Sequence, residues 1–312
     1  MADPKVTVMI NTYNDKRCVG KAIRSVLAQT LQAHEILVID DGSTDGTREL
    51  IELEFGNQVT YHYHANRGIG GSRNVGIAMS TGDWIAFLDS DDHWMPEKLE
   101  LQVAELRAHP NAAMVSCWAL ESTFDDTVVG KMGLPQPFTR EVIRSELRRR
   151  GIFTPSGAMV RRDVLLKVEG FPEDIMFCED WVTFCRIAAS YEIAAVHKSL
   201  FYKTQLMESL SSKPKAPLKD GLIALQRCKE ALASHTWPQS WMDFVAFRQS
   251  ETQLHLHTAW LYAKARDKKK SLAILLKGLV HCPFLAVWQY RSIYWLCARL
   301  LERNDAKPAT SM

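Results

Sequence analysis

The chain has 312 residues, of which 46% are hydrophobic and 24% are charged, and its formal net charge at pH 7 is +2. These proportions are ordinary for a soluble globular protein, and the length is enough for one large α/β domain with a smaller unit, or for two domains. A net charge this close to zero gives no argument for a nucleic-acid partner. The seven cysteines are scattered without a CxxC pair, which favours reduced, mostly buried thiols over a metal or disulfide framework.

The N-terminus lacks the features of a signal peptide, because Asp3, Pro4 and Lys5 stand directly before the first apolar run. No stretch reaches the roughly 18 uncharged apolar residues of a membrane-spanning helix. Together these two features predict a cytoplasmic location.

The N-terminal half alternates short apolar runs with segments of helical spacing. In chain order the elements are a strand at 6–11, a helix at 15–29, a strand at 34–40, a helix at 44–55, a strand at 59–65, a helix at 72–80, a strand at 84–89, a helix at 96–109 and a strand at 112–120. Ser43 or Thr44 is the expected cap of the second helix, and Pro96 is tolerated at the start of the fourth. Strands separated by helices predict a mostly parallel sheet flanked by helices.

Polar residues follow three of these strands at the point where each one ends. The segments are NTYND (11–15), DDGS (40–43) and DSDD (89–92). One such cluster alone would be better explained by Asx turns and helix caps. In a parallel sheet, however, all three ends share one edge, and ligands bind beyond the carboxyl ends of the strands. Three clusters with five aspartates on one edge therefore predict a binding site.

The same residues exclude two common kinds of nucleotide site. The turn NTYND contains no glycine, so the dinucleotide fingerprint is absent, and the chain has no GxxxxGK[ST] phosphate loop. What remains is a site that meets phosphates through a divalent cation held by carboxylates. Asp89 and Asp91 would point to the same side of an extended chain, as such a site requires.

Three segments together resemble the family 2 glycosyltransferases of the GT-A fold. They are VTVMINTYND, ILVIDDGSTDGT and NRGIGGSRNVGIAMSTGDWIAFLDSDDHWMPEKLE; the likeness is close over residues 5–110 and looser through FCEDWVTFCRIA (177–188). The resemblance implies a Rossmann-like GT-A catalytic domain over residues 1–215, followed by a helical C-terminal region over 216–312. It further implies inverting transfer of a sugar from a nucleotide diphosphate sugar, most often a UDP-sugar, to a hydroxyl acceptor, with Mn²⁺ or Mg²⁺ as cofactor.

The resemblance also implies which residues bind the nucleotide. Asn11 and Tyr13 are expected to line the pocket for the base. Asp41 is expected to make a polar contact to the base, with Asp40 nearby. Arg73 is expected close to the nucleotide, where its charge would balance that of the ligand.

For the metal and the chemistry, the resemblance implies a DxD element. Asp89 is expected near the ribose and as a second metal ligand, Asp91 toward the metal on the diphosphate, and Asp92 as a residue that orients the sugar or supports the metal shell. Asp180 corresponds to the general base, since an acceptor hydroxyl attacks well only when a carboxylate takes its proton. The alternative is that Glu179 and Asp180 are solvated acids in the first turn of a helix, favoured by the helix dipole.

The chain departs from the family pattern in FYKTQLMESLS (201–211). Members often carry an arginine and a histidine there, whereas this chain has Lys203 and, near the histidine position, Gln205. The surroundings of the metal beyond Asp91 are therefore left open.

The C-terminal region is expected to be helical beyond a linker marked by Pro214 and Pro217. The basic run KARDKKK (264–270) precedes apolar and aromatic helices, a pattern typical of a segment that lies on a membrane surface. Such contact would suit a protein that is peripheral at the inner face of the cell membrane, with a glycan or lipid-linked glycan as acceptor. Packing against the catalytic domain or a second copy is the alternative, which leaves an oligomer open.

Two other classes compete with a glycosyltransferase. A nucleotidyltransferase would also bind a nucleotide through a metal, but its first loop should be rich in glycine with a lysine or arginine. A non-catalytic module that binds nucleotide sugars would lack the base, whereas Asp180 is present. No motif between residues 115 and 215 identifies the sugar or the acceptor.

Overall fold

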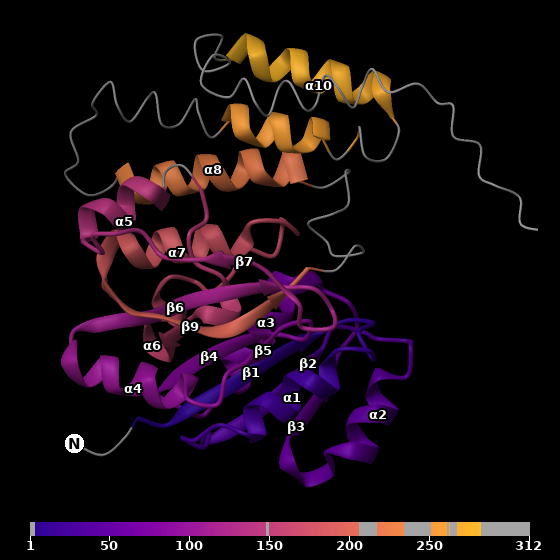
Figure 1. Cartoon of the computed structure of the whole chain (residues 1–312), viewed down its shortest axis with the longest axis vertical. Coiled ribbons are helices and arrows are strands. Elements are labelled where there is room, and N and C mark those ends of the chain that lie inside the picture. The colour runs from indigo at the N-terminus through magenta and orange to yellow at the C-terminus, as the bar shows by residue number, and fades with distance from the viewer. Residues whose placement is uncertain are drawn as a thin grey trace, which may run out of the picture.

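The computed structural model describes residues 4–147, 150–205, 217–233, 251–260, 262 and 267–281. A sheet with helices on both faces forms the body of the protein, and further helical segments stack in layers beyond one of those faces (Figure 1). These outer layers are α8 (Pro217–Ala233), residues 251–260 and α10 (Lys268–His281). The predicted α/β fold with a helical C-terminal extension is confirmed.

Four parallel strands form the first part of the sheet. Strand β1 (Val6–Thr12) pairs with β2 (Glu35–Asp40) on one side and with β4 (Trp84–Asp89) on the other, and β3 (Thr60–Tyr63) pairs with β2. Every residue of β1 is buried, as expected for an apolar, β-branched run with helices on both faces of its sheet.

The second part of the sheet is mixed. The short strand β8 (Met159–Arg161) runs antiparallel between β4 and β6 (Ala112–Ser122), and β6 forms a long parallel ladder with β9 (Glu192–Thr204). Antiparallel strands β7 (Val128–Met132) and β5 (His93–Trp94) pair with β6 and β9. Since β4 and β6 both oppose β8, the strands β1, β2, β4, β6 and β9 all end at the same edge. Parallel ladders hold most of the paired residues, which confirms the predicted sheet type.

Two hydrophobic cores lie on opposite faces of the sheet, because alternate residues of each strand point to opposite sides. Met9 belongs to one core, whereas its neighbours Val8 and Ile10 belong to the other. The first core includes residues of α3 (Gly68–Met79), α5 (Arg140–Leu147), α6 (Arg162–Lys167) and α7 (Glu179–Ser190), and the second includes residues of α1 (Val19–Leu27), α2 (Thr47–Glu54) and α4 (Lys98–Ala108).

The helices begin at other residues than the sequence predicts. Starts predicted at 15, 72 and 96 lie at 19, 68 and 98. Helix α2 begins at Thr47, after Gly46 in the left-handed conformation with φ 87°. The prediction that Ser43 or Thr44 caps α2 is wrong, because Ser43 Oγ accepts a hydrogen bond from the backbone N–H of Asn14 at 2.8 Å. Ser43 thus binds the loop after β1, and the side chain in this loop that accepts a hydrogen bond from the start of α2 is Asp45, from the backbone N–H of Thr47 at 3.1 Å.

Helix α8 packs against α7 and shares its core. Its buried residues belong to the same hydrophobic cluster as those of α7; they are Ala224, Leu225, Cys228 and Leu232. Helix α8 therefore extends the packing of the N-terminal half, and the domain boundary near residue 215 stays a prediction.

The cysteines of the described residues are free, and four of them are buried: Cys18, Cys117, Cys185 and Cys228. Their burial agrees with the prediction, whereas Cys282 and Cys297 lie outside the described residues. Within the described helices, none is long and apolar enough to cross a bilayer.

Candidate active site

The three polar clusters meet at one edge of the sheet. Asn11 is opposite Asp89 in the ladder between β1 and β4, and Thr12 is opposite Asp40 in the ladder between β1 and β2. The loops are tied together beyond the ladders, since the backbone N–H of Ser90 donates to the carbonyl of Asn11 at 3.2 Å. The sequence prediction that these strand ends lie together is confirmed.

On the nucleotide side, Asp40 and Asp41 occupy different positions. Both oxygens of the fully buried Asp40 carboxylate accept protein hydrogen bonds, from the backbone N–H of Ser43 and from the hydroxyl of Tyr61, each at 2.7 Å. Asp41 accepts a 2.7 Å bond from the backbone N–H of Arg67, and burial raises the pKa of its carboxyl. Asp40 thus braces the loop, which leaves Asp41 as the better candidate for a ligand contact.

Asn11 and Tyr13 flank the end of β1. The side-chain amide of the buried Asn11 donates to the hydroxyl of Ser72 at 2.9 Å, which joins β1 to α3. Tyr13 is 53% exposed and lies two residues further along the loop. An exposed aromatic ring at a strand end suits stacking on a base. The position of Tyr13 is therefore compatible with the predicted place in the base pocket.

The DSDD segment gathers carboxylates that repel one another. Burial and the neighbouring carboxylates of Asp92 and Asp89 raise the pKa of Asp91 above the ordinary aspartate value. Burial also raises the pKa of Asp92, whose Oδ1 accepts a 2.9 Å bond from the backbone N–H of Thr204 on β9. Burial is the largest cause in both residues, so these carboxylates lie where their negative charge is poorly solvated.

Two cationic side chains of the protein face these acids. Arg73 on α3 donates to Asp89 Oδ1 at 2.8 Å and to Glu179 Oε1. Burial by itself lowers the pKa of Lys203, but the carboxylates of Asp92, Asp89 and Asp180 outweigh burial and raise it. Within the described residues, Arg73 and Lys203 thus face at least five carboxylates, those of Asp89, Asp91, Asp92, Glu179 and Asp180. The excess negative charge is what a divalent cation would offset.

The donor set fits a cation site that the substrate completes. Among the described residues no group of three or more His, Cys, Asp or Glu side chains is arranged to hold a metal ion. Mg²⁺ and similar hard cations often use one or two carboxylates together with substrate phosphates, so the DSDD carboxylates are chemically suitable. Because Arg73 already engages Asp89, Asp91 is the stronger candidate ligand.

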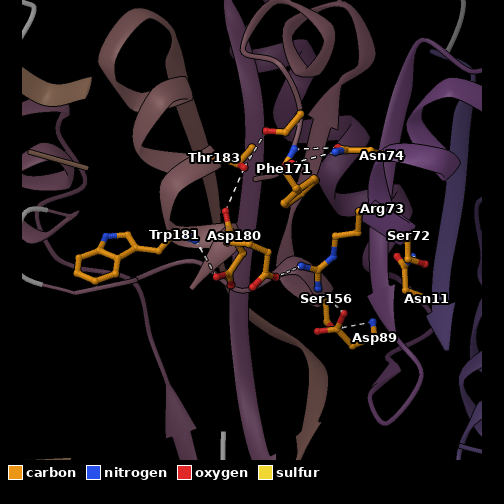
Figure 2. A network of polar contacts seen from close by, with 12 residues as sticks. Asn11, Ser72, Arg73, Asn74, Asp89, Ser156, Phe171, Asp180, Trp181 and Thr183 are labelled. Carbon is orange, nitrogen blue, oxygen red and sulfur yellow. Dashed lines mark hydrogen bonds and ion pairs between the residues drawn. The ribbon is translucent and has the colours of Figure 1, made fainter. Parts of the chain in front are cut away.

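Asp180 lies in the first turn of α7, beside the cluster. Its Oδ1 accepts a 2.7 Å bond from the backbone N–H of Trp181, and burial raises the pKa of its carboxyl. Glu179, the preceding residue, is 6% exposed and pairs with Arg73. The alternative that both residues are solvated acids is therefore wrong for Glu179. Figure 2 shows Arg73 between Asp89 and the start of α7.

Some residues of the site were not predicted from the sequence. Ser156, in the short 3₁₀ helix η2 (Pro155–Gly157), accepts a bond from the backbone N–H of Asp89 at 3.1 Å. Its surroundings, TPSG, look like an ordinary turn, so no sequence signal marks it. Lys203 does face the carboxylates, whereas the neighbouring Gln205 is exposed. Residues 206–216, which include the rest of this segment, lie outside the described residues.

The comparisons with known proteins agree with the geometry of the site. The sequence profile of the family described as Glycosyl transferase family 2 matches residues 7–168. The chain belongs to this family. An uncharacterized glycosyltransferase from Nostoc sp. is 35% identical over 190 residues, which cover 59% of the chain and 58% of that protein. The chain thus spans just over half the length of this relative.

A second family relative has a more specific name. The Escherichia coli protein UDP-Glc:alpha-D-GlcNAc-diphosphoundecaprenol beta-1,3-glucosyltransferase WfgD is 31% identical over 201 residues, which cover 63% of this chain and 75% of that protein.

Solved structures confirm the GT-A fold. The S. aureus protein TarS (residues 1–349, in complex with UDP-GlcNAc) superposes with a TM-score of 0.59 at 18% identity, over 92% of this chain and 91% of that one. The mannosyltransferase PcManGT from Pyrobaculum calidifontis, in complex with GDP-Man and Mn²⁺, also has a TM-score of 0.59, at 20% identity over 96% and 86%. At sequence identities this low, the structural similarity supports the fold alone.

Proposed function

We propose that the chain is an inverting, metal-dependent glycosyltransferase that moves a sugar from a nucleotide diphosphate sugar to a hydroxyl acceptor. The observation that carries the proposal is the meeting of two groups at one sheet edge. The DSDD cluster lies at the end of β4, and Asp180 lies beside it at the start of α7. The first group suits a diphosphate with its cation, and the second suits a hydroxyl that must lose a proton.

The residues of the site serve a single displacement at the anomeric carbon, some on the acceptor side and others on the donor side. Asp180 takes the proton of the acceptor hydroxyl as its oxygen attacks the anomeric carbon. The bond from that carbon to the diphosphate oxygen breaks on the opposite face, so an α-linked donor gives a β-linked product. Asp41 and Tyr13 bind the base, with Asn11 beside them, and Asp92 orients the sugar. One base and one leaving group are enough, so no covalent nucleophile is required.

Asp91 would hold the divalent cation, Mn²⁺ or Mg²⁺, together with oxygens of the diphosphate. When bound, the cation offsets the charge that develops on the leaving diphosphate. The proposal of a UDP-sugar donor is supported by the names of two similar proteins, WfgD with UDP-Glc and TarS with UDP-GlcNAc. WfgD's name also gives an acceptor on diphosphoundecaprenol, which supports a lipid-linked glycan as acceptor here.

A lipid-linked acceptor would place the protein at the inner face of the cell membrane, and α10 supports such contact. Its inner side is buried at Ser271 and Leu275, while Leu272 and Leu276 on the outer side are 49% and 54% exposed. Exposed lysines, among them Lys277, share this outer side. Leucines flanked by lysines suit the surface of an anionic bilayer. The aromatic helices predicted beyond Pro283 lie outside the described residues.

Flotation with anionic vesicles at low salt tests this contact. The intact chain should float with the vesicles, and Leu272→Ser combined with Leu276→Ser should lower the floated fraction severalfold. Leu53→Ser, which removes an exposed leucine from α2, is the matched control. If the intact chain does not float, or the control loses as much as the α10 variant, α10 is not a membrane contact.

The competing classes have less support. The first loop, NTYND, stays without the glycines and the lysine or arginine that a nucleotidyltransferase needs. A module that only binds nucleotide sugars would not need Asp180 beside the DSDD cluster. Incubation with a panel of nucleotide sugars and Mn²⁺, followed by detection of the released nucleotide diphosphate, tests the proposal. Slow release from one donor, accelerated by a glycan acceptor, is expected; release of pyrophosphate, or no turnover with any donor and acceptor, would contradict it.

A further inference from the structure

Arg73 links two parts of the site that are far apart in the sequence. It lies on α3, and its guanidinium reaches Asp89 at the end of β4 on one side and Glu179 at the start of α7 on the other. Glu179 is separated from Arg73 by 106 positions. The residue next to Glu179 is Asp180, the proposed base. The buried ion pair therefore joins the donor side to the helix that carries the base (Figure 2).

The geometry of Arg73 does not suit direct binding of a phosphate. Its side chain is 3% exposed, both terminal nitrogens donate to carboxylates, and the guanidinium carbon lies 5.1 Å from the ring centroid of Phe171. The remaining Nε–H is buried with no hydrogen-bond partner among the described residues. A diphosphate has little access to this guanidinium, because the side chain is 3% exposed and carboxylates already engage both terminal nitrogens.

The surrounding contacts fix the segment before α7 in its position relative to α3. The side chain of Asn74 forms two 2.9 Å hydrogen bonds with the backbone N–H and C=O of Phe171. Gly70 permits the close approach, since a Cβ at this position would lie 2.2 Å from the carbonyl oxygen of Pro172. Segment 170–173 is thus fixed on α3 by backbone contacts.

The start of α7 depends on such outside contacts. Cys178, the residue before the helix, has a φ of 65°, a conformation that costs free energy in residues with a Cβ. Local preference therefore does not select this backbone, whereas the ion pair between Glu179 and Arg73 stabilises it from outside.

We infer that Arg73 and Glu179 are positioning residues that set the place of Asp180 relative to the donor, and that Arg73 is not a ligand of the nucleotide. The inference rests on the proposed function, because it concerns the geometry of that transfer. A misplacement of about 1 Å can cost on the order of 10²-fold in rate. Glu179 is the better residue to test, because its change leaves the contact between Arg73 and Asp89 in place.

The test uses full-length Glu179→Gln and Glu179→Asp. Glutamine keeps the length and a hydrogen-bond acceptor without the charge, and aspartate keeps the charge but is one methylene shorter. Both variants should lower kcat about 10–10²-fold at saturating donor, while the Kd for UDP with Mn²⁺ should stay within about twofold. A role of Glu179 in charge balance alone would spare the aspartate variant. Asp174→Asn, which removes an exposed partner of Arg227 on α8, is the control and should keep its kcat.

A double-mutant cycle shows whether Glu179 acts through Asp180. Adding Glu179→Gln to Asp180→Asn should cause no further loss of kcat, because the base is already absent. Three outcomes would overturn the inference. In the first, the kcat losses of Glu179→Gln and Asp180→Asn multiply in the double variant. In the others, both Glu179 variants keep a kcat within twofold of wild type, or their Kd for UDP rises in step with the loss of kcat. Failure of the wild-type chain to transfer any sugar would instead contradict the proposed function, so the two failures are distinguishable.

Discussion

Replacing Asp180 by asparagine should remove most of the turnover while keeping the fold. One carboxylate oxygen of Asp180 accepts a hydrogen bond from the backbone N–H of Trp181 at 2.7 Å, and an amide oxygen can accept the same bond. The side chain therefore keeps its size and its orientation in the first turn of α7. What asparagine cannot do is take the proton of the acceptor hydroxyl.

The expected loss follows from the surroundings of the carboxylate. General-base catalysis contributes about 10²–10⁴-fold, which corresponds to roughly 2.7–5.4 kcal/mol of activation free energy. Burial raises the pKa of Asp180, although the charge of Arg73 opposes this rise. Because the side chain is only partly exposed, water has limited access to take its place as the base. A loss of about 10³-fold in kcat is therefore expected, with little change in UDP affinity.

The assay compares initial rates at saturating donor, with UDP affinity from calorimetry and thermal unfolding as checks of the fold. Asp174→Asn is the matched control, since Asp174 is an exposed carboxylate that pairs with Arg227 on α8. Glu179 cannot serve as the control, because it is buried and pairs with Arg73. Near-native turnover of Asp180→Asn, or an equal loss in Asp174→Asn, would refute Asp180 as the base.

Further predictions concern the metal, the base pocket and pH. Removing the divalent cation with EDTA, or changing Asp91 to alanine, should reduce UDP affinity at least tenfold in calorimetry; equal affinity with and without metal would contradict the cation site. Asp41→Ala should raise the Kd for UDP while leaving kcat at saturating donor within a few fold, and a loss of kcat alone would exclude Asp41 from the base pocket. Because the pKa of Asp180 is raised and its base form is the deprotonated one, kcat should begin to fall on acidification at a higher pH than an exposed aspartate would allow. A kcat that is flat down to the ordinary aspartate pKa would disagree.

The strand ends of the site were accessible from the sequence because local patterns determine them. Buried apolar runs specify the strands, and a parallel sheet brings their carboxyl ends to one edge, so the placement of Asn11, Asp40 and Asp89 follows without coordinates. The short strands β8 and β5 were not predicted, since two or three residues carry no readable period.

Long-range partners were not accessible in the same way. Glu179 resembles an exposed acid in the first turn of a helix, and only the fold brings Arg73 to it and buries the pair. The start of α2 was misplaced for a related reason. Capping residues such as Ser43 can bind any nearby backbone group, and here Ser43 binds the N–H of Asn14 in another loop. Which partner a polar side chain finds depends on packing that a single sequence does not display.

The central claim is a single displacement at the anomeric carbon, with Asp180 as base and the diphosphate as leaving group. It is tested most directly by NMR of the product formed from an α-linked nucleotide diphosphate sugar, where the coupling constant of the anomeric proton reports the configuration. A β-linked product in the presence of Mn²⁺, lost in Asp180→Asn, is the predicted result. An α-linked product would contradict the mechanism, because it requires either two displacements or attack from the face of the leaving group.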